Sequence, residues 1–185
     1  GTTIAACFAD LGHDVTSVDI DEDIVAAVND GEAPIHEPGL DPLVSIYGGD
    51  QLRATTDYDA IREADVTFLA LPTPKNDDGS IDTSIMEAGA ESVGEAIADK
   101  DGYHLVVVKS TVVPGTTEDT LTPIIEDASG KTAGEDFGVA VNPEFLREGT
   151  AVDDFMEPDK IVVGTDGDGR ALDLLAEVYE PLVLQ

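Results

Sequence analysis

The sequence predicts an α/β fold built around a doubly wound, mostly parallel sheet. Short apolar runs typical of buried strands, at residues 66–71 and 105–108, alternate along the chain with segments of helical periodicity. The longest helical segment, residues 83–97, lies between these two runs, where a parallel pair needs its crossover. Hydrophobic residues make up 42% of the 185 residues, enough for one buried core. We therefore expect a single domain over residues 1–185, without internal repeats.

The other elements follow in order along the chain. An apolar helix opens the chain and gives way to a strand at 15–20, after which Asp21 is expected to cap a helix that ends at Asn29-Asp30-Gly31. Further helices are predicted at 40–47, 116–128 and 170–179, one or two helical turns at 58–64, and further strands at 52–55, 139–141 and 161–163. Residues 76–80 and 129–136, rich in glycine and acids, are expected to be loose.

The charge of the chain excludes several classes of partner. With 9 Lys+Arg against 40 Asp+Glu, the formal net charge is −31, and the acids are spread over the whole sequence. Such a field repels nucleic acid and anionic membranes, so neither is an expected partner. At molar salt the Debye length falls to about 3 Å and the self-repulsion is screened. We interpret the sequence as halophilic; the alternative is an acidic domain without salt adaptation.

Targeting, disulfide and metal signals are weak in this sequence. No apolar run approaches the roughly 18 residues that cross a bilayer, and no basic segment precedes an apolar one as in a secretory signal. The one cysteine, Cys7, cannot form an internal disulfide, and His13, His36 and His104 lack metal-ligand spacing. We expect a soluble, cytoplasmic protein without a metal site.

The residues that directly follow the strands are the candidate ligand site. In an open parallel sheet, ligands bind outside the carboxyl ends of the strands. Here those positions hold Asp19, Thr73, Ser110 with Thr111, and the segment 142–148.

The first part of the chain has the spacing of a dinucleotide-binding turn. Gly1 opens the first helix and Asp19 ends the following strand. This spacing matches a Rossmann fingerprint, in which the ribose-binding acid lies about 20 residues beyond the glycine-rich turn. Gly1 would be the last glycine of that turn, with the first strand and earlier glycines missing from this chain. A carboxylate at the ribose repels a 2′-phosphate, which favours NAD over NADP. A solvated acidic cap is the alternative interpretation of Asp19.

One segment carries a specific family resemblance. Residues 142–149 read N-P-E-F-L-R-E-G, and this segment resembles the signature of the UDP-glucose/GDP-mannose dehydrogenases. Other matching segments occur in the same order, namely Gly12-His13-Asp14-Val15, Val18-Asp19-Ile20-Asp21, Glu37-Pro38-Gly39-Leu40, Leu71-Pro72-Thr73-Pro74 and Lys109-Ser110-Thr111-Val112-Val113-Pro114-Gly115. Together they cover nearly the whole chain.

The resemblance implies a reaction and a larger protein. Members of this family oxidise a primary alcohol of a nucleotide sugar to a carboxylate by two hydride transfers to NAD⁺, through a thioester on a cysteine. That cysteine lies in a second half-domain, after a central helix that builds a homodimer, so the resemblance makes this chain the NAD-binding part of a longer enzyme. The residues N-P-E-F-L-R-E-G of the signature favour UDP-glucose as the substrate. The alternatives are GDP-mannose, UDP-N-acetylmannosamine, a 6-phosphogluconate-type dehydrogenase, or a non-catalytic nucleotide-binding module.

The same resemblance assigns roles to residues of the candidate site. It makes Glu144 the general acid and base of thioester hydrolysis, and Thr111, with Ser110, a residue that orders water or contacts the cofactor. It places Thr73 over the cofactor pyrophosphate and Glu148 at the nicotinamide, bordering the substrate. The substrate-binding set would be Glu144, Phe145, Leu146, Arg147 and Glu148. Alternatives are a solvated acid for Glu144, a helix cap for Thr111 and a partner of the neighbouring acids for Arg147.

The cysteine in this chain is not the expected nucleophile. Cys7 lies between Ala6 and Phe8 on the apolar first helix, where it is expected to be a small core residue. We therefore expect the 185-residue chain alone to show no turnover.

Overall fold

The computed structural model describes residues 1–183, and the chain divides into two compact units. Unit 1 comprises Gly1–Ala60, Phe145–Ile161 and the segment from Glu177 onward, and unit 2 comprises Ile61–Glu144 and Val162–Ala176. Both units contain parallel strands connected through helices, which confirms the predicted α/β fold.

Unit 1 is built on a two-stranded parallel sheet. Strand β1 (Val15–Val18) pairs with β2 (Leu52–Thr55), with Val15 opposite Leu52. The helices of this unit are α1 (Thr2–Asp10), α2 (Glu22–Asn29), α3 (Leu40–Tyr47) and α6 (Ala151–Met156). The centroid of the Phe8 ring on α1 lies 5.0 Å from that of Phe155 and 5.6 Å from that of Tyr179, so an aromatic cluster forms part of the core.

Two helix ends in unit 1 agree with the sequence signals. The Asp21 carboxylate accepts a hydrogen bond of 2.9 Å from the backbone N–H of Asp23, which confirms the predicted cap of α2. Helix α3 ends at Gly48, where a Cβ atom would lie 2.4 Å from the Val28 carbonyl oxygen. Only glycine allows this approach of the two helix ends. The backbone of Gly48 is extended, with φ −61° and ψ 134°, so the predicted helix 40–47 stops there.

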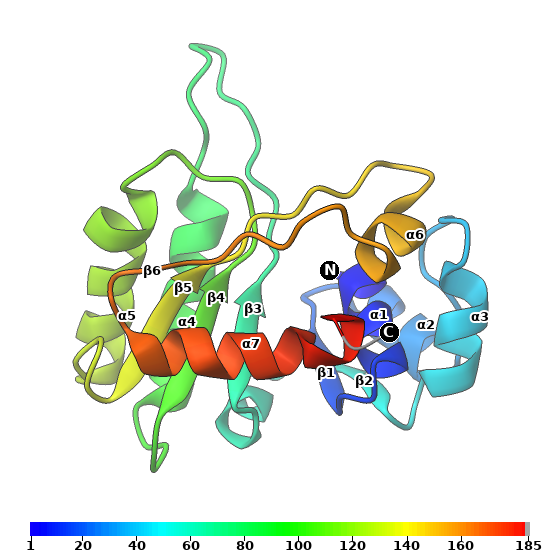
Figure 1. Ribbon diagram of the computed structural model, residues 1–185, viewed down its shortest axis with the longest axis horizontal. Coiled ribbons are helices and arrows are strands. Elements are labelled where there is room, and N and C mark those ends of the chain that lie inside the picture. Colours follow the sequence, from blue (N-terminus) through cyan, green and yellow to red (C-terminus); the bar gives the residue numbers. More distant parts are fainter. Residues whose placement is uncertain (184–185) are drawn as a thin grey trace. The chain divides into compact units, whose positions relative to one another are not determined.

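Unit 2 is built on a four-stranded sheet. Its strands are β3 (Val66–Leu69), β4 (His104–Val108), β5 (Phe137–Val141) and β6 (Gly164–Thr165); the first three are parallel and β6 is antiparallel to β5. Helices α4 (Ser84–Ile97) and α5 (Thr122–Ser129) pack against each other, and α4 contacts β3. The first part of α7 (Gly169–Val183) crosses in front of these strands in Figure 1.

Three segments differ from the prediction. The strand expected at 161–163 is wrong, because the pairing with β5 is made directly after that segment, by Gly164 and Thr165. The single helix expected at 116–128 begins with a π-helical turn, η2 (Thr117–Leu121), before α5. By contrast, the one or two helical turns expected at 58–64 are confirmed as the 3-10 helix η1 (Tyr58–Glu63). Helix α6 was not predicted.

The segment expected to be loose at 76–80 is a closed turn. Asn76 donates its backbone N–H to the Ser80 carbonyl at 2.8 Å, and Lys75 forms a β-bridge with Ile81. It forms the tip of the long excursion between β3 and α4 that rises from the sheet in Figure 1.

Within residues 1–183, none of the helices is both long and apolar enough to cross a membrane. In the same part of the chain, no three or more His, Cys, Asp or Glu side chains are grouped so that they could hold a metal ion.

Candidate active site

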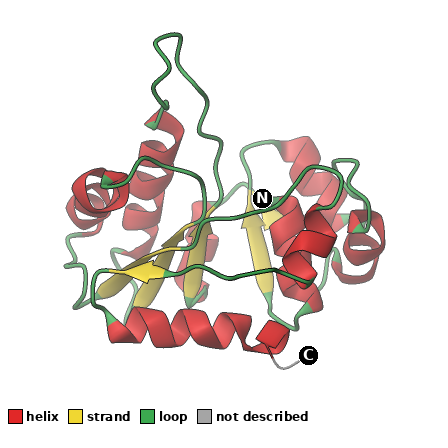
Figure 2. Cartoon of the chain, turned by 45° about the horizontal axis from the view of Figure 1, so that its top comes forward, coloured by secondary structure: helices red, strands yellow, loops and turns green. Residues whose placement is uncertain are grey.

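The strands of unit 2 end level with one another, and this brings four of the expected site residues to one edge. Leu69 of β3 pairs with Val108 of β4, and Val108 pairs with Val141 of β5. The segments that leave this edge carry Thr73, Ser110 with Thr111, and Glu144. Figure 2 shows the three parallel strands side by side, with the loops continuing from their carboxyl ends. The candidate site of unit 2 is this edge.

Ser110 joins the ends of β3 and β4. Its hydroxyl accepts a hydrogen bond of 2.8 Å from the backbone N–H of Leu71 and lies 2.7 Å from the Leu71 carbonyl oxygen, to which it donates. The backbone N–H of Ser110 also reaches the Leu69 carbonyl at 3.2 Å. The side chain therefore continues the pairing of the two strands beyond Leu69 and sets where the loop carrying Thr73 begins.

Thr111 and Glu144 differ in exposure. Thr111 is exposed and Glu144 half-buried. The cap of η2 is Thr116, so the alternative role of Thr111 as that helix cap does not apply. A carboxylate and a hydroxyl at one sheet edge can exchange a proton with water and orient it, which is the chemistry required of a general base.

A buried lysine at this edge was missed by the sequence analysis. Lys109 is only 5% exposed, and its ammonium nitrogen lies 3.0 Å from Oδ1 and 3.3 Å from the carbonyl oxygen of Asn142. Burial lowers the pKa of Lys109 to about 8, and the nearby negative charge of Glu144 acts in the opposite direction. The available sequence signal was a charged residue directly after an apolar strand.

In unit 1, Asp19 and Gly1 lie at element ends, as expected. The backbone N–H of Asp19 continues the β1–β2 ladder to the Thr55 carbonyl at 3.0 Å, and its Oδ1 accepts from the N–H of Asp21 at 3.0 Å. Gly1 is the N-cap of α1, and a Cβ atom there would meet no described atom within 4 Å.

The signature segment continues in unit 1, where Arg147 is bound to an acid that the sequence analysis did not single out. Arg147 Nη2 lies 2.6 Å from Asp154 Oδ1, and both Nε and the backbone N–H of Arg147 donate to Asp154 Oδ2. The hydroxyl of Thr150 donates to the same oxygen at 3.0 Å. Arg147 keeps the pKa of Asp154 well below its usual range through these hydrogen bonds. Asp154 thus fixes the fold of the segment before α6.

Glu37 holds the next part of the same segment. Its buried carboxylate accepts hydrogen bonds from the backbone N–H groups of Gly149, at 3.0 Å, and Ala151, at 2.9 Å. Gly39, with a φ of +84°, brings the following turn so close that a Cβ atom would lie 3.2 Å from the Val152 side chain. The Glu37-Pro38-Gly39 turn therefore supports the signature segment in unit 1.

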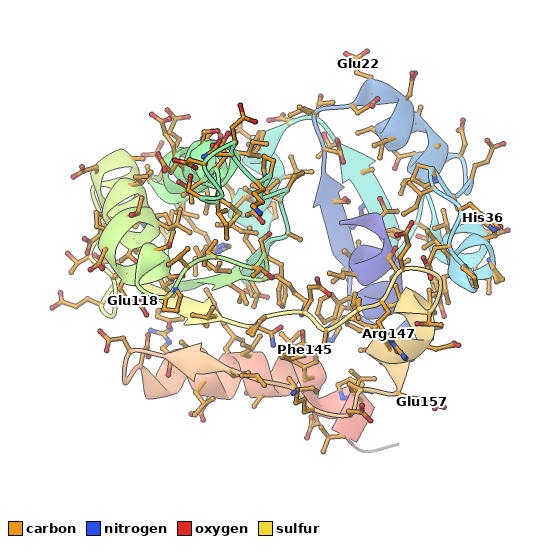
Figure 3. The ribbon with its side chains drawn as sticks, turned by 90° about the horizontal axis from the view of Figure 1, so that it is seen from above. Glu22, His36, Glu118, Phe145, Arg147 and Glu157 are labelled. Carbon is orange, nitrogen blue, oxygen red and sulfur yellow. The ribbon has the colours of Figure 1, made fainter. Side chains whose placement is uncertain are left out.

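The other residues of the segment are placed as follows. Phe145 is 51% exposed, and the ammonium nitrogen of Lys160 lies 4.6 Å from its ring centroid. Leu146 is half-buried and Glu148 is exposed. Figure 3 shows Phe145 and Arg147 on the one connection that leads into α6.

Cys7 has the environment of a core residue. It is completely buried on α1, and burial raises the pKa of its thiol to about 12. A nucleophilic cysteine needs a thiolate that substrate can reach. Cys7 satisfies neither condition.

Comparisons with known proteins agree over nearly the whole chain. A UDP-glucose 6-dehydrogenase from Haloferax volcanii is 67% identical over 183 residues, which cover 99% of this chain and 42% of that protein. Among solved structures, the ternary complex of GDP-mannose dehydrogenase from Pseudomonas aeruginosa superposes with a TM-score of 0.93 at 42% identity, covering 97% of this chain and 42% of that one. A UDP-glucose dehydrogenase from Pyrobaculum islandicum gives a TM-score of 0.90 at 43% identity, covering 97% of this chain and 41% of that one.

The chain spans less than half the length of these relatives. Residues 1–183 match the sequence profile described as "UDP-glucose/GDP-mannose dehydrogenase family, NAD binding domain". The resemblance in the signature segment is thus confirmed over the described length, and the chain belongs to this family as its NAD-binding domain.

Proposed function

We propose that this domain is the cofactor-binding part of an enzyme that oxidises UDP-glucose to UDP-glucuronate. The observation that carries the proposal is the 67% identity to a UDP-glucose 6-dehydrogenase over 99% of the chain. In this reaction the C6 alcohol and one water become a carboxylate, two NAD⁺ become two NADH, and three protons are released. Residues 1–185 would form one NAD-binding domain of that longer enzyme.

The residues present fit a dinucleotide. NAD⁺, when bound, accepts hydride. Asp19 lies at the carboxyl end of β1, where its carboxylate is suited to accept hydrogen bonds from ribose hydroxyls. The neighbouring Ile20 side chain is 84% exposed and offers an apolar surface beside that carboxylate. Gly1, at the start of α1, would approach the pyrophosphate, and Thr73, Ser110, Thr111 and Glu148 complete the proposed cofactor set.

Glu144 and Thr111 would serve the last step of the reaction. A thioester on a cysteine outside this chain must be hydrolysed by water, whose proton needs a base and whose oxygen must face the carbonyl carbon. Glu144 would accept this proton, and Thr111 would orient the water. Phe145, Leu146, Arg147 and Glu148 would line the substrate. Their placement on a segment held by Glu37 and Asp154 supports a preorganised substrate contact.

GDP-mannose is the second candidate substrate. A GDP-mannose 6-dehydrogenase from Pseudomonas syringae is 42% identical over 98% of the chain, and the high TM-score of the Pseudomonas aeruginosa enzyme shows the same fold.

The test of the proposed function is a panel of UDP-glucose, GDP-mannose and UDP-N-acetylmannosamine with the full-length protein and NAD⁺ at molar KCl. The proposal expects two NADH per UDP-glucose. A faster reaction with either other sugar nucleotide would contradict the choice of substrate, and no NADH with any would contradict the function.

The isolated chain is the matched control for that assay. It lacks the expected cysteine, so the 185-residue chain should release no NADH from UDP-glucose at molar KCl. NADH formation by the chain alone would contradict the proposal that the catalytic cysteine lies outside this chain.

The proposed function is accompanied by proposals on the salt adaptation, the oligomeric state and the cellular location of the enzyme. The net charge of −31 supports a halophilic protein, for which raising KCl from 0.1 M to 2 M should raise the thermal unfolding temperature. An unchanged or lower temperature would contradict this. A homodimer through a central helix outside this chain, a cytoplasmic location and a role in polysaccharide biosynthesis rest on the resemblance to the family.

A further inference from the structure

A buried ammonium group at the carboxyl edge of unit 2 has no assigned role in the proposed reaction. Lysine is rarely buried to 95%, because desolvating its charge costs several kcal/mol unless partners compensate. Lys109 directly precedes Ser110 and Thr111, and its partners lie on the next strand end. Lys109 therefore lies between two strand ends that carry candidate site residues.

Asn142 is the partner, and its orientation is fixed from two sides. Asn142 is 1% exposed; its Nδ2 donates to the Val162 carbonyl at 2.8 Å, while its Oδ1 accepts from Lys109 at 3.0 Å. Lys109 also lies 3.3 Å from the Asn142 carbonyl oxygen. One ammonium group therefore holds both the side chain and the backbone of Asn142.

Asn142 is the last residue anchored to the sheet before Glu144. Its backbone N–H donates to the Val108 carbonyl at 2.9 Å, and the following Pro143 has no N–H and restricts Asn142 to extended conformations. The path of the chain into Glu144 is therefore set at Asn142. Lys109 and Glu144 also attract each other electrostatically.

We propose that Lys109 is a positioning residue for Glu144: its buried ammonium anchors Asn142 and thereby fixes the segment that presents the Glu144 carboxylate. This inference rests on the proposed function, in which Glu144 acts on water during thioester hydrolysis. Both hydride transfers precede that hydrolysis. A displaced Glu144 should therefore slow the last step and leave the first two intact.

The test is Lys109→Met in the full-length enzyme, with Lys131→Met as matched control. Lys131 also donates to a backbone carbonyl, that of Lys100, and precedes β5 rather than following a strand. We expect Lys109→Met to lower kcat about tenfold to hundredfold. KM for UDP-glucose should fall in parallel, because slowing a step after both hydride transfers leaves kcat/KM unchanged. Rapid mixing should show a burst of two NADH per active site before slow turnover, and mass spectrometry should show an accumulated acyl-enzyme. Lys131→Met should show wild-type kcat and no acyl-enzyme.

Other outcomes overturn the inference. A kcat within about twofold of wild type, or a loss of the burst itself, would show that Lys109 does not act through Glu144. If Lys109→Met does not fold, Asn142→Ser carries the test, because it removes the Oδ1 anchor and should reproduce the burst with slow turnover.

A second readout does not depend on turnover. Amide hydrogen exchange over residues 142–146 should rise severalfold in Lys109→Met and stay at the wild-type rate in Lys131→Met. Equal exchange in all three proteins would overturn the positioning role. Absence of NADH formation by wild type with every sugar nucleotide would instead contradict the proposed function, so the two failures are distinguishable.

Discussion

The Arg147 guanidinium and the Asp154 carboxylate meet as two parallel hydrogen bonds, Nη2 to Oδ1 at 2.6 Å and Nε to Oδ2 at 3.1 Å. Paired bonds of this kind restrict the relative orientation of the two groups as well as their distance. Since the backbone N–H of Arg147 reaches the same carboxylate, Asp154 determines the path of the chain as well as the place of one side chain.

Asp154→Asn should therefore release the segment before α6. The asparagine keeps one acceptor but loses the charge and one of the paired bonds, so amide exchange at Arg147 and Thr150 should rise severalfold at pH 7. Asp153→Asn, on the exposed neighbour, should leave exchange unchanged. Because the pKa of Asp154 is lowered in the fold, its contribution is present above the unfolded value of about 3.9 and is lost as the pH falls below it. Wild-type protection that disappears already near pH 6 would contradict this assignment.

Glu37→Gln should destabilise the chain. The substituted amide presents N–H groups to one of the two backbone donors, Gly149 or Ala151, and leaves that donor unpaired in a buried place. The expected cost is about 1–3 kcal/mol, or a drop of several degrees in the thermal midpoint. Glu32→Gln, on an exposed acid of the same loop, removes the same charge without these contacts. Equal midpoints for the two variants would argue against the support role of Glu37.

His104 should make the unfolding free energy depend on pH. Its Nδ1 donates to the Ala64 carbonyl and its Nε2 accepts from Thr67, so the neutral ring satisfies both partners. Burial is the main cause that lowers the pKa of His104 to about 4. The unfolded chain then binds the proton more readily, so this stability is complete above pH about 6.5 and is lost as the pH falls toward 4.

The measurement is denaturant unfolding between pH 7.5 and 4. Replacing His104 by Gln should reduce the slope of free energy against pH by up to about 1.4 kcal/mol per unit in this window. His36→Gln, on an exposed ring, should keep the wild-type slope. A parallel shift of the whole curve without a change of slope would contradict the role of His104.

Cys7 should be inert to alkylation in the folded chain. A thiol with a pKa raised from 9.0 to about 12 holds about a thousandfold less thiolate at pH 8, and burial excludes the reagent as well. Iodoacetamide should add no mass to native protein within minutes and one label per chain in guanidinium. Native labelling at the rate of the unfolded chain would refute the core assignment.

The sequence predicted best the elements whose signal is local. The predicted bounds 40–47 and 52–55 are those of α3 and β2, because an apolar face with glycines after it, or a short alternating run, needs no distant partner to be recognised. Helix α6 was missed since it has six residues and its start is held by Glu37, a residue 114 positions away from Ala151. The interrupted helix at 117–129 had a visible signal in Pro123, which suits the first turn of a new helix but not the interior of a long one.

The candidate site shows the same division. Strand ends could be located from composition, so the places of Asp19, Thr73, Ser110 and Glu144 at element ends were predictable. Their supporting contacts were not: Lys109 with Asn142, and Arg147 with Asp154, are chosen by the register of the sheet and the path of a loop, for which residue type alone gives no preference.

The hydroxyl of Ser110 has a consequence for domain engineering. The side chain of Ser110 satisfies both the N–H and the C=O of Leu71. The backbone conformation at the start of the loop after β3 therefore depends on a residue that follows the neighbouring strand β4. A chimera that places residues 71–83 of this chain in a relative without a hydroxyl at position 110 would leave two backbone groups of the graft unpaired. The loop after β3 and the residue at position 110 therefore have to be exchanged together in any chimera of this domain.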